Sequence, residues 1–340
     1  MIILGIETSC DDTCIAIYDT KYGLLANKKY TQPIHTIFGG VIPKFSSIYH
    51  LNKLIPIIKN LLLKLKIHQN NINAIAYTAG PGLYNSLIIG AYIAYSISYT
   101  LTIPIIGVHH LEGHIFSAMI NKNQPTFPFI SLLISGGHTQ LLDVHNIGHY
   151  KILGESLDDS IGETFDKIAK LLNLSYPGGE KLSNLANCGK IKKHLFPKIL
   201  ATNLHFSFSG IKTYIFNYFK QLNFKKKHQY KANVAKSFEE YILNILSIKC
   251  YKALSKYGRS CLILSGGVSA NKNLRKNFIN KLKNKINNFT IYFPEKPLCT
   301  DNAAMIAYVG AIRITSGEKI HKNIIIRPTW SLEKLKYPLF

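Results

Sequence analysis

The chain has 340 residues, of which 47% are hydrophobic, and this excludes a disordered chain and is enough for about two domains. Six scattered cysteines exclude a disulfide-rich scaffold. The first residues run directly into a polar turn, without the charged and apolar regions of a secretory signal. We therefore expect a reduced, globular, cytoplasmic protein.

The charge balance is strongly positive, because 41 Lys and Arg oppose 18 Asp and Glu and give a net charge of +23. Lysines dominate, and only Arg259, Arg275, Arg313 and Arg327 are arginines. A lysine-rich surface favours a polyanionic partner such as a nucleic acid. The codon composition of an AT-rich genome would produce the same excess, so the charge alone leaves both explanations open.

The first half of the chain alternates apolar strands with helices. Residues 2–6 and 14–18 read as two strands of a hairpin, joined by an acidic, hydroxyl-rich turn at 7–13. A helix near residues 50–65, a strand at 74–78 and a Gly-Pro-Gly turn at 80–82 follow, before a further strand at 103–108. Each strand is short and bounded by turn residues, which is typical of an α/β protein.

An uncharged stretch between Ile67 and His109 resembles a membrane span in composition only. Serines and threonines interrupt it and Pro104 ends it, whereas a span needs about 20 consecutive apolar residues. We expect a buried helix here and no contact with a membrane.

The second half repeats the opening pattern about 125 residues further on. An apolar strand from 129, the turn Ser135-Gly136-Gly137-His138-Thr139 and a second apolar strand to 144 form another hairpin. A short strand at 262–264 then ends in Ser265-Gly266-Gly267 before a helical start. Two copies of a hairpin followed by helices predict a duplicated α/β fold with mixed sheets covered on both faces.

A candidate metal site begins with His110 and His114. On a helix these positions share one face, so both imidazoles can reach one cation. Glu112 lies two residues after the first histidine rather than one, which weakens a zinc-peptidase interpretation. Asp301 is the candidate third ligand, although an aspartate at that place could equally be only a helix N-cap. Two histidines and a carboxylate suit Fe²⁺ and tolerate Zn²⁺ or Mn²⁺.

Three glycine turns form a second candidate feature. Those at 135–139, 177–179 and 265–267 each let the backbone approach a phosphate or nucleotide closely. Asp166, in the helix that opens at 162–167, could contact ribose. Asn271, which begins the helix after the third turn, could contact adenine or ribose. A surface role for Asp166 and a capping role for Asn271 are the plainer alternatives.

Nine segments in this order resemble the TsaD (Gcp) family over nearly the whole chain: GIETSCDDT, TAGPGL, VHHLEGH, LLISGGHT, GETFDKIAKLL, YPGG, FSFSGIKT, LSGGVSANKNLR and CTDNAAMIA. The resemblance implies a duplicated, two-lobed actin-like (ASKHA) ATPase fold with a cleft between the lobes. The expected lobes are residues 1–125 and 126–315, with a tail at 316–340 packing back on the first lobe.

The resemblance also implies an activity. Members of the family transfer the threonylcarbamoyl group from threonylcarbamoyl-AMP to N6 of adenosine 37, in tRNAs reading codons that begin with A. The reaction forms t6A and releases AMP. Implied partners are tRNA, a separate synthase that makes threonylcarbamoyl-AMP, a non-catalytic TsaB-like paralogue and a small TsaE-like ATPase.

Site residues can be assigned from the family motifs. His110, His114 and Asp301 match the ligands of one divalent metal, usually iron. The residues that match the substrate-binding positions are Leu133, Ile134, Ser135, Gly136, Gly137, Asp166, Gly179 and Asn271. The resemblance names no general base, and Asp11 and Asp12 at the first hairpin turn are our candidates.

This chain departs from the family pattern at several positions. Asp12 stands where most members have Glu, and Cys14 where Gly is usual. Residues 43–48 read PKFSSI instead of PELASR, and Ser183 replaces an acid that some relatives place on the ribose. Two other functions stay open: a metal-dependent endopeptidase, and a non-enzymatic ATP-binding scaffold that would be indifferent to chelators.

Overall fold

The computed structural model describes residues 1–120, 124–191, 196, 203–221, 224–283, 285, 288–318 and 323–335, with the backbone alone at 224–229. Two compact units divide the chain. Unit 1 comprises Met1–Gln124, Ile147–His149 and Pro294–Phe340, and unit 2 comprises Pro125–Asn146 and Tyr150–Phe293.

Unit 1 is built on a five-stranded sheet in the order β3-β2-β1-β4-β5. β1 pairs antiparallel with β2 and parallel with β4, so the sheet is mixed. The strands are β1 (Ile2–Glu7), β2 (Asp12–Asp19), β3 (Gly23–Thr31), β4 (Ala74–Gly80) and β5 (Ile105–His109). The helices are α1 (Ile34–Phe38), α2 (Pro43–Leu65), α3 (Tyr84–Leu101), α4 (His110–Phe116), α10 (Lys296–Cys299) and α11 (Ala303–Thr315).

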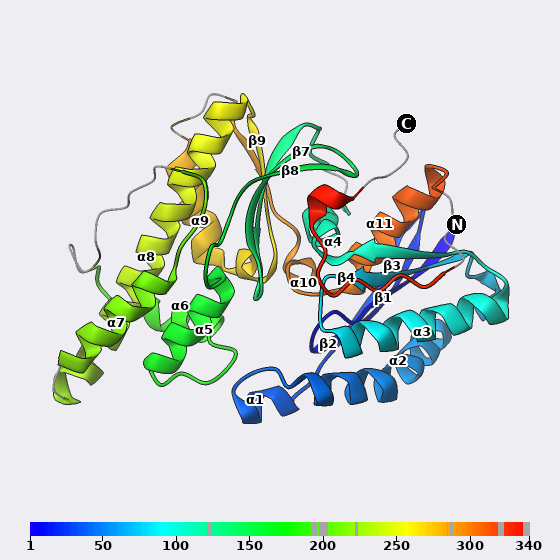
Figure 1. Ribbon diagram of the computed structural model, residues 1–340, viewed down its shortest axis with the longest axis horizontal. Coiled ribbons are helices and arrows are strands. Elements are labelled where there is room, and N and C mark those ends of the chain that lie inside the picture. The colour runs from blue at the N-terminus through cyan, green and yellow to red at the C-terminus, as the bar shows by residue number, and fades with distance from the viewer. Residues whose placement is uncertain are drawn as a thin grey trace. The chain divides into compact units, whose positions relative to one another are not determined.

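Alternating side chains of β1 and β2 bury both faces of this sheet. Leu4 and Ile6 join a core with Leu54 of α2 and Ala91 of α3, and those two helices lie side by side (Figure 1). The opposite face carries small residues, so α11 approaches closely. A Cβ on Gly5 would lie 2.5 Å from the carbonyl oxygen of Ala303. The sequence pattern of large and small residues therefore decides which helix covers which face.

The described tail and the segment before it belong to unit 1. The sequence analysis placed residues 294–315 in the second lobe, whereas the structure groups them with unit 1 because α11 contacts β1, β2 and β4. In residues 323–335, Ile324, Ile325 and Ile326 are partly buried and pack against the core of unit 1. The remaining tail residues, 319–322 and 336–340, lie outside the described part of the chain.

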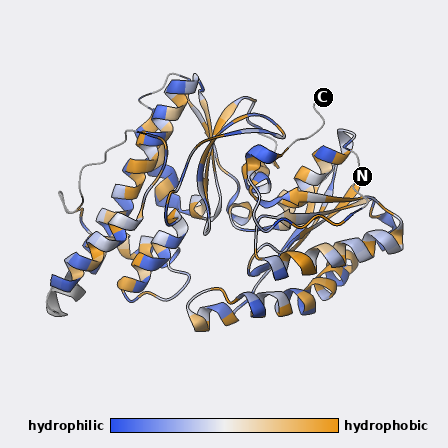
Figure 2. Ribbon diagram, in the orientation of Figure 1, coloured by the Kyte–Doolittle hydropathy of each residue, from blue (hydrophilic) through white to orange (hydrophobic). Residues whose placement is uncertain are grey.

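The expected buried helix is α3, and it is only half buried. Ala91 and Ala94 face the core, while Tyr92 and Tyr99 are 57% and 78% exposed. The small residues face the sheet, and the tyrosines keep their hydroxyl ends in water. Figure 2 shows hydrophobic and hydrophilic stretches alternating along α2 as well. In the described part of the chain, no helix is long and apolar enough to cross a membrane.

Unit 2 repeats the strand order of unit 1, as β8-β7-β6-β9-β10. Its strands are β6 (Phe129–Ile134), β7 (Thr139–Asn146), β8 (His149–Glu155), β9 (Cys261–Ser265) and β10 (Thr290–Tyr292). Its helices are α5 (Ile161–Leu171), α6 (Gly179–Asn187), α7 (Ser209–Gln221), α8 (Phe224–Tyr257) and α9 (Lys272–Lys283). β6 again pairs antiparallel with the next strand and parallel with a later one. The duplicated α/β fold predicted from the sequence is confirmed.

Candidate active site

The two candidate histidines lie one turn apart on α4, which begins directly after β5 without a loop. All seven residues of this helix are buried. The rings of His110 and His114 meet edge to face, with centroids 4.7 Å apart. Glu112 is fully buried in the same helix. The spacing predicted from the sequence therefore places both imidazoles together.

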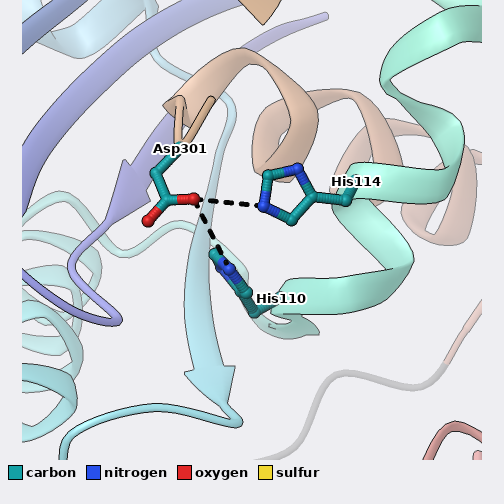
Figure 3. A group of neighbouring side chains, drawn as sticks. All are labelled: His110, His114 and Asp301. Atoms are coloured by element: carbon teal, nitrogen blue, oxygen red, sulfur yellow. Dashed lines mark hydrogen bonds and ion pairs between the residues drawn. The ribbon is translucent and has the colours of Figure 1, made fainter. Parts of the chain in front are cut away.

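Asp301 joins the pair from the turn between α10 and α11 (Figure 3). Its Oδ1 lies 3.1 Å from Nε2 of His114 and 3.7 Å from Nε2 of His110. One ligand atom from each of the three residues lies within 4.8 Å of the others. The N-cap of α11 is instead Asn302, whose side chain accepts from the backbone N–H of Met305. The capping alternative for Asp301 is therefore wrong.

Glu7, at the end of β1, orients His110 from behind. Its Oε2 lies 3.0 Å from Nδ1 of His110, and the side chain is fully buried. Thr78 and the backbone of Ser9 also donate to this carboxylate. A carboxylate on one ring nitrogen leaves the other facing Asp301, which is the usual arrangement behind a metal-bound histidine. The sequence analysis missed this residue.

The side chains of this site shift one another's pKa values strongly. Burial alone would lower the pKa of His110, but attraction to Glu7 and Asp301 outweighs burial and raises it to about 9. The same attraction holds the pKa values of Glu7 and Asp301 low despite burial. Burial lowers the pKa of His114, so its imidazole is neutral at pH 7. The carboxylates of Glu7 and Asp301 thus favour a positive charge beside them.

The residues fit a divalent cation. Two imidazoles and a carboxylate supply three converging ligand atoms, and Glu7 adds the outer carboxylate. Nδ1 of His114 is buried and has no hydrogen-bond partner among the described residues. Its Nε2 is the atom directed at Asp301. The donor set leaves coordination positions for substrate or water, as a catalytic metal requires.

The two base candidates lie where the turn after β1 enters β2, with Asp12 as the first residue of β2. Asp12 forms an ion pair with Lys29 through Oδ2, while its buried Oδ1 accepts no hydrogen bond from the described residues. Burial raises the pKa of Asp12 to about 6, even though Lys29 lowers it. Asp11 lies in the turn itself and is partly exposed. Asp12 is therefore the better placed of the two to accept a proton near neutral pH.

A buried hydrogen-bond network holds this turn in place. Nδ1 of His50 lies 2.8 Å from the hydroxyl of Thr13, and its Nε2 donates to the carbonyl of Cys10 at 2.9 Å. Ser46 also donates to Cys10 and lies 2.9 Å from the hydroxyl of Ser86. Ser46 belongs to the segment that departs from the family pattern and stands where that pattern has Ala, so this chain supports the turn with an additional hydroxyl.

In unit 2, five of the expected substrate residues end β6 and form its glycine turn. Leu133 and Ile134 are fully buried in the strand, and Ser135 closes the turn through its hydroxyl and the N–H of His138. Gly136 and Gly137 are exposed, and nothing lies within 4 Å of the place that a Cβ would take on either. The turn thus offers backbone that a ligand can approach.

The helix α5 carries Asp166 and begins against this turn. Gly162, at the start of α5, contacts the backbone of Ser135, and a Cβ there would lie 2.5 Å from its carbonyl oxygen. One turn later Oδ1 of Asp166 accepts from the N–H of Gly178 at 2.7 Å. Asp166 is partly exposed, and it fixes the turn that begins α6.

Asn271 connects α6 to α9 and has the capping role, while its contact with ribose or adenine stays a prediction. Its Oδ1 caps α9 by accepting from the N–H groups of Asn273 and Leu274. Its Nδ2 donates to Ser183 at 2.7 Å and to Glu239 at 3.2 Å. Glu239 is 1% exposed and was missed by the sequence analysis. Glu239 therefore provides a carboxylate near Ser183, where some relatives have an acid.

Comparisons with known proteins agree on the family. A family model described as TsaD, tRNA N6-adenosine threonylcarbamoyltransferase, matches residues 23–308. The chain is 49% identical over 338 residues to a protein of that name from Wigglesworthia glossinidia brevipalpis. It is 46% identical over 336 residues to another from Buchnera aphidicola subsp. Baizongia pistaciae. Each match covers 98% of this chain and 98% of the relative.

The similarity of this chain to solved structures concerns its fold alone. The HypF structure from T. kodakarensis matches with a TM-score of 0.64 at 14% identity, over 93% of this chain and 48% of HypF. This chain therefore spans about half the length of HypF. The activator of 2-hydroxyisocaproyl-CoA dehydratase from Clostridium difficile matches with a TM-score of 0.52 at 13% identity, over 95% and 100% of the two chains. Because the family model matches residues 23–308 and the two curated relatives are 46% and 49% identical, the chain belongs to the TsaD family of tRNA N6-adenosine threonylcarbamoyltransferases.

Proposed function

We propose that this enzyme forms t6A with one divalent metal held by His110, His114 and Asp301. The observation that carries the proposal is the convergence of these three side chains within 4.8 Å, on a buried helix and an adjoining turn. When bound, the metal would supply a Lewis acid for charge that develops on the carbamoyl oxygen. Fe²⁺ is our choice from the donor set, with Zn²⁺ or Mn²⁺ as alternatives.

The protein's own groups position the reactants. Open backbone at Gly136 and Gly137 would bind the phosphate of threonylcarbamoyl-AMP, with the Asp166-supported turn at Gly179 beside it. The Asn271 cluster would contact the ribose. Because an exocyclic adenine amine is a poor nucleophile, orientation of the two substrates would supply much of the rate.

Proton transfer falls to Asp12 in this proposal. The bond from N6 of adenosine 37 to the carbamoyl carbon forms, and the bond from that carbon to the phosphate oxygen of AMP breaks. The N6 proton would pass to the carboxylate of Asp12, whose pKa burial raises to about 6. AMP leaves with the electron pair of the broken bond.

Partner surfaces can be proposed from exposed side chains. Leu51 and Leu63 of α2 and Tyr99 of α3 are large, apolar and exposed, and this face would bind the TsaB-like paralogue. Lysines would bind tRNA phosphates and make its affinity salt-dependent. Threonylcarbamoyl-AMP would come from a separate synthase, with the TsaE-like ATPase as a further partner and the cytoplasm as the compartment.

His114→Ala tests the metal and the activity together. We expect t6A formation from threonylcarbamoyl-AMP and tRNA to fall by about a thousandfold, because a Lewis acid supplies several kcal/mol. Mass analysis of tRNA nucleosides measures the product, and elemental analysis measures the bound metal. His68→Ala is the matched control, since His68 is exposed and distant from α4 in sequence. A metal-free His114→Ala protein with full activity would contradict the proposal.

A further inference from the structure

The residue before the first candidate ligand uses both of its ring nitrogens inside the protein. His109 is fully buried at the N-cap of α4, where Nδ1 accepts from the backbone N–H of Leu111 at 3.1 Å. Its Nε2 donates to the backbone carbonyl of Trp330 at 3.1 Å. An amide only donates and a carbonyl only accepts, so the ring carries its proton on Nε2. One imidazole thus joins α4 to the tail of the chain.

Residues that precede this contact also attach the tail to β4. We call residues 323–335 the C-terminal strap. The hydroxyl of Tyr77 donates to the carbonyl of Ile325 at 3.0 Å and accepts from its N–H at 2.9 Å. Further along, the N–H of Arg327 donates to the carbonyl of Ala79 at 2.7 Å. The strap therefore lies along β4, where the Tyr77 hydroxyl and the Ala79 carbonyl hold it.

Close approach of the strap depends on a glycine. Gly80 ends β4 with a φ of +144°, and a Cβ there would lie 1.8 Å from the carbonyl oxygen of Arg327. Any side chain at this position would displace the strap. Arg327 in turn stacks over the ring of Trp330, with its guanidinium carbon 4.9 Å from the ring centroid. The Trp330 ring contacts the His109 ring, with centroids 4.7 Å apart.

The ligand helix is short enough to depend on this anchor. α4 has seven residues, and His110 occupies its first position, directly after His109. Few internal hydrogen bonds fix a helix of this length, so its N-cap has a large share in its orientation. A rotation at His109 would turn His110 away from Glu7 and Asp301.

We propose that the C-terminal strap sets the geometry of the metal centre through His109, which acts as a positioning residue and not as a ligand. The proposal rests on the proposed metal site. Two hydrogen bonds of the His109 ring, to the Trp330 carbonyl and from the N–H of Leu111, link the strap to the first turn of α4. Loss of the link would weaken metal binding and lower kcat, while the KM for tRNA would not change.

His109→Asn removes the hydrogen bond to the strap and keeps the N-cap of α4. Asparagine can still accept from the N–H of Leu111, so the cap is retained. Its shorter side chain cannot reach the Trp330 carbonyl. We expect Zn²⁺ to bind the metal-stripped variant about tenfold more weakly than the wild type, as for other residues behind a metal ligand. Calorimetric titration with Zn²⁺ measures affinity, and thermal unfolding confirms the fold.

Gly80→Ala moves the strap while leaving His109 intact, and it should weaken Zn²⁺ binding to a similar extent. Trp330→Phe keeps both the backbone carbonyl and an aromatic ring, so near-normal affinity is expected. If Gly80→Ala does not fold, the Zn²⁺ affinity of His109→Asn tests the proposal by itself. Normal Zn²⁺ affinity in His109→Asn would overturn the strap proposal. A wild-type protein that binds no Zn²⁺ would overturn the metal site and this proposal with it.

Discussion

Units 1 and 2 share one strand order and differ in the turns that leave their first strands. In unit 1 the first strand ends in Glu7, and the acidic turn with Asp11 and Asp12 comes after it. The corresponding strand of unit 2 ends at Ile134 and leads into a turn of serine and glycines. The duplicated scaffold thus presents charged side chains in one unit and open backbone in the other. The chemistry depends on the turn residues, because the sheets are alike.

The largest expected difference between the two units is in metal affinity, and it can be measured by replacing one buried glutamate in each unit. Glu7→Gln removes the charge behind His110, and we expect metal affinity and kcat to fall by roughly 10- to 100-fold. Glu239→Gln is the matched change in unit 2, because that side chain is also almost fully buried. It should leave the metal affinity at the wild-type value. Equal metal affinity in both variants would contradict the assignment of the metal site to unit 1.

A smaller effect is expected at the glycine turn of unit 2. Gly137→Val has space for its side chain and should fold normally. The added methyl groups would obstruct approach to the backbone, so the KM for threonylcarbamoyl-AMP should rise about tenfold. Gly210→Val, at another open position in unit 2, is the control. Steady-state kinetics with varied threonylcarbamoyl-AMP measures the change, and an unaltered KM would exclude this turn from substrate binding.

The smallest expected effects are on the free energy of unfolding. They come from replacing one aspartate in each unit. Asp158 accepts hydrogen bonds from Ser207, Phe208 and Ser209, and these donors outweigh burial and lower its pKa below 3.8. Replacing it with Ala should cost about 1 kcal/mol at pH 7. Asp19 accepts from the N–H groups of Lys21 and Tyr22, and its pKa is likewise lowered against burial. Asp19→Ala should therefore behave similarly.

The pH dependence of both effects has a defined sign. A folded pKa below the unfolded value stabilises the protein above the unfolded pKa. This contribution disappears as the pH falls below about 4 and through the folded pKa. Urea unfolding at pH 7, 5 and 3 should therefore show each alanine variant approaching the wild type at the lowest pH. A difference that stays constant across this range would show that the carboxylate charge contributes nothing.

Local patterns in the sequence predicted much of the fold and site. The histidine spacing on α4 is a property of one short segment, so periodicity alone placed both rings on one face. Asp301 required the family resemblance, since nothing local distinguishes it from the neighbouring cap Asn302. Glu7 was missed because its partner His110 is 103 residues away, and only the sheet brings them together.

Elements without strong patterning were also missed. The edge strand β3 contains lysines and is half exposed, so it lacks an apolar alternation. α2 begins at Pro43, seven residues before the predicted start, because proline suits the first helical turn and the N-cap residue Ile42 provides no side-chain cap. The strap was expected to pack on unit 1, but its bond to His109 joins residues 221 apart and leaves no signal in the sequence.

Trp330 is the single tryptophan of the chain, and it lies half-buried on unit 1 against His109. Its fluorescence therefore reports the unfolding of unit 1, whereas far-ultraviolet circular dichroism reports the helices of both units. If the two signals change at different urea concentrations, the duplicated halves unfold independently. The protein thus carries a natural optical probe, and labelling is unnecessary for comparing the stability of its two units.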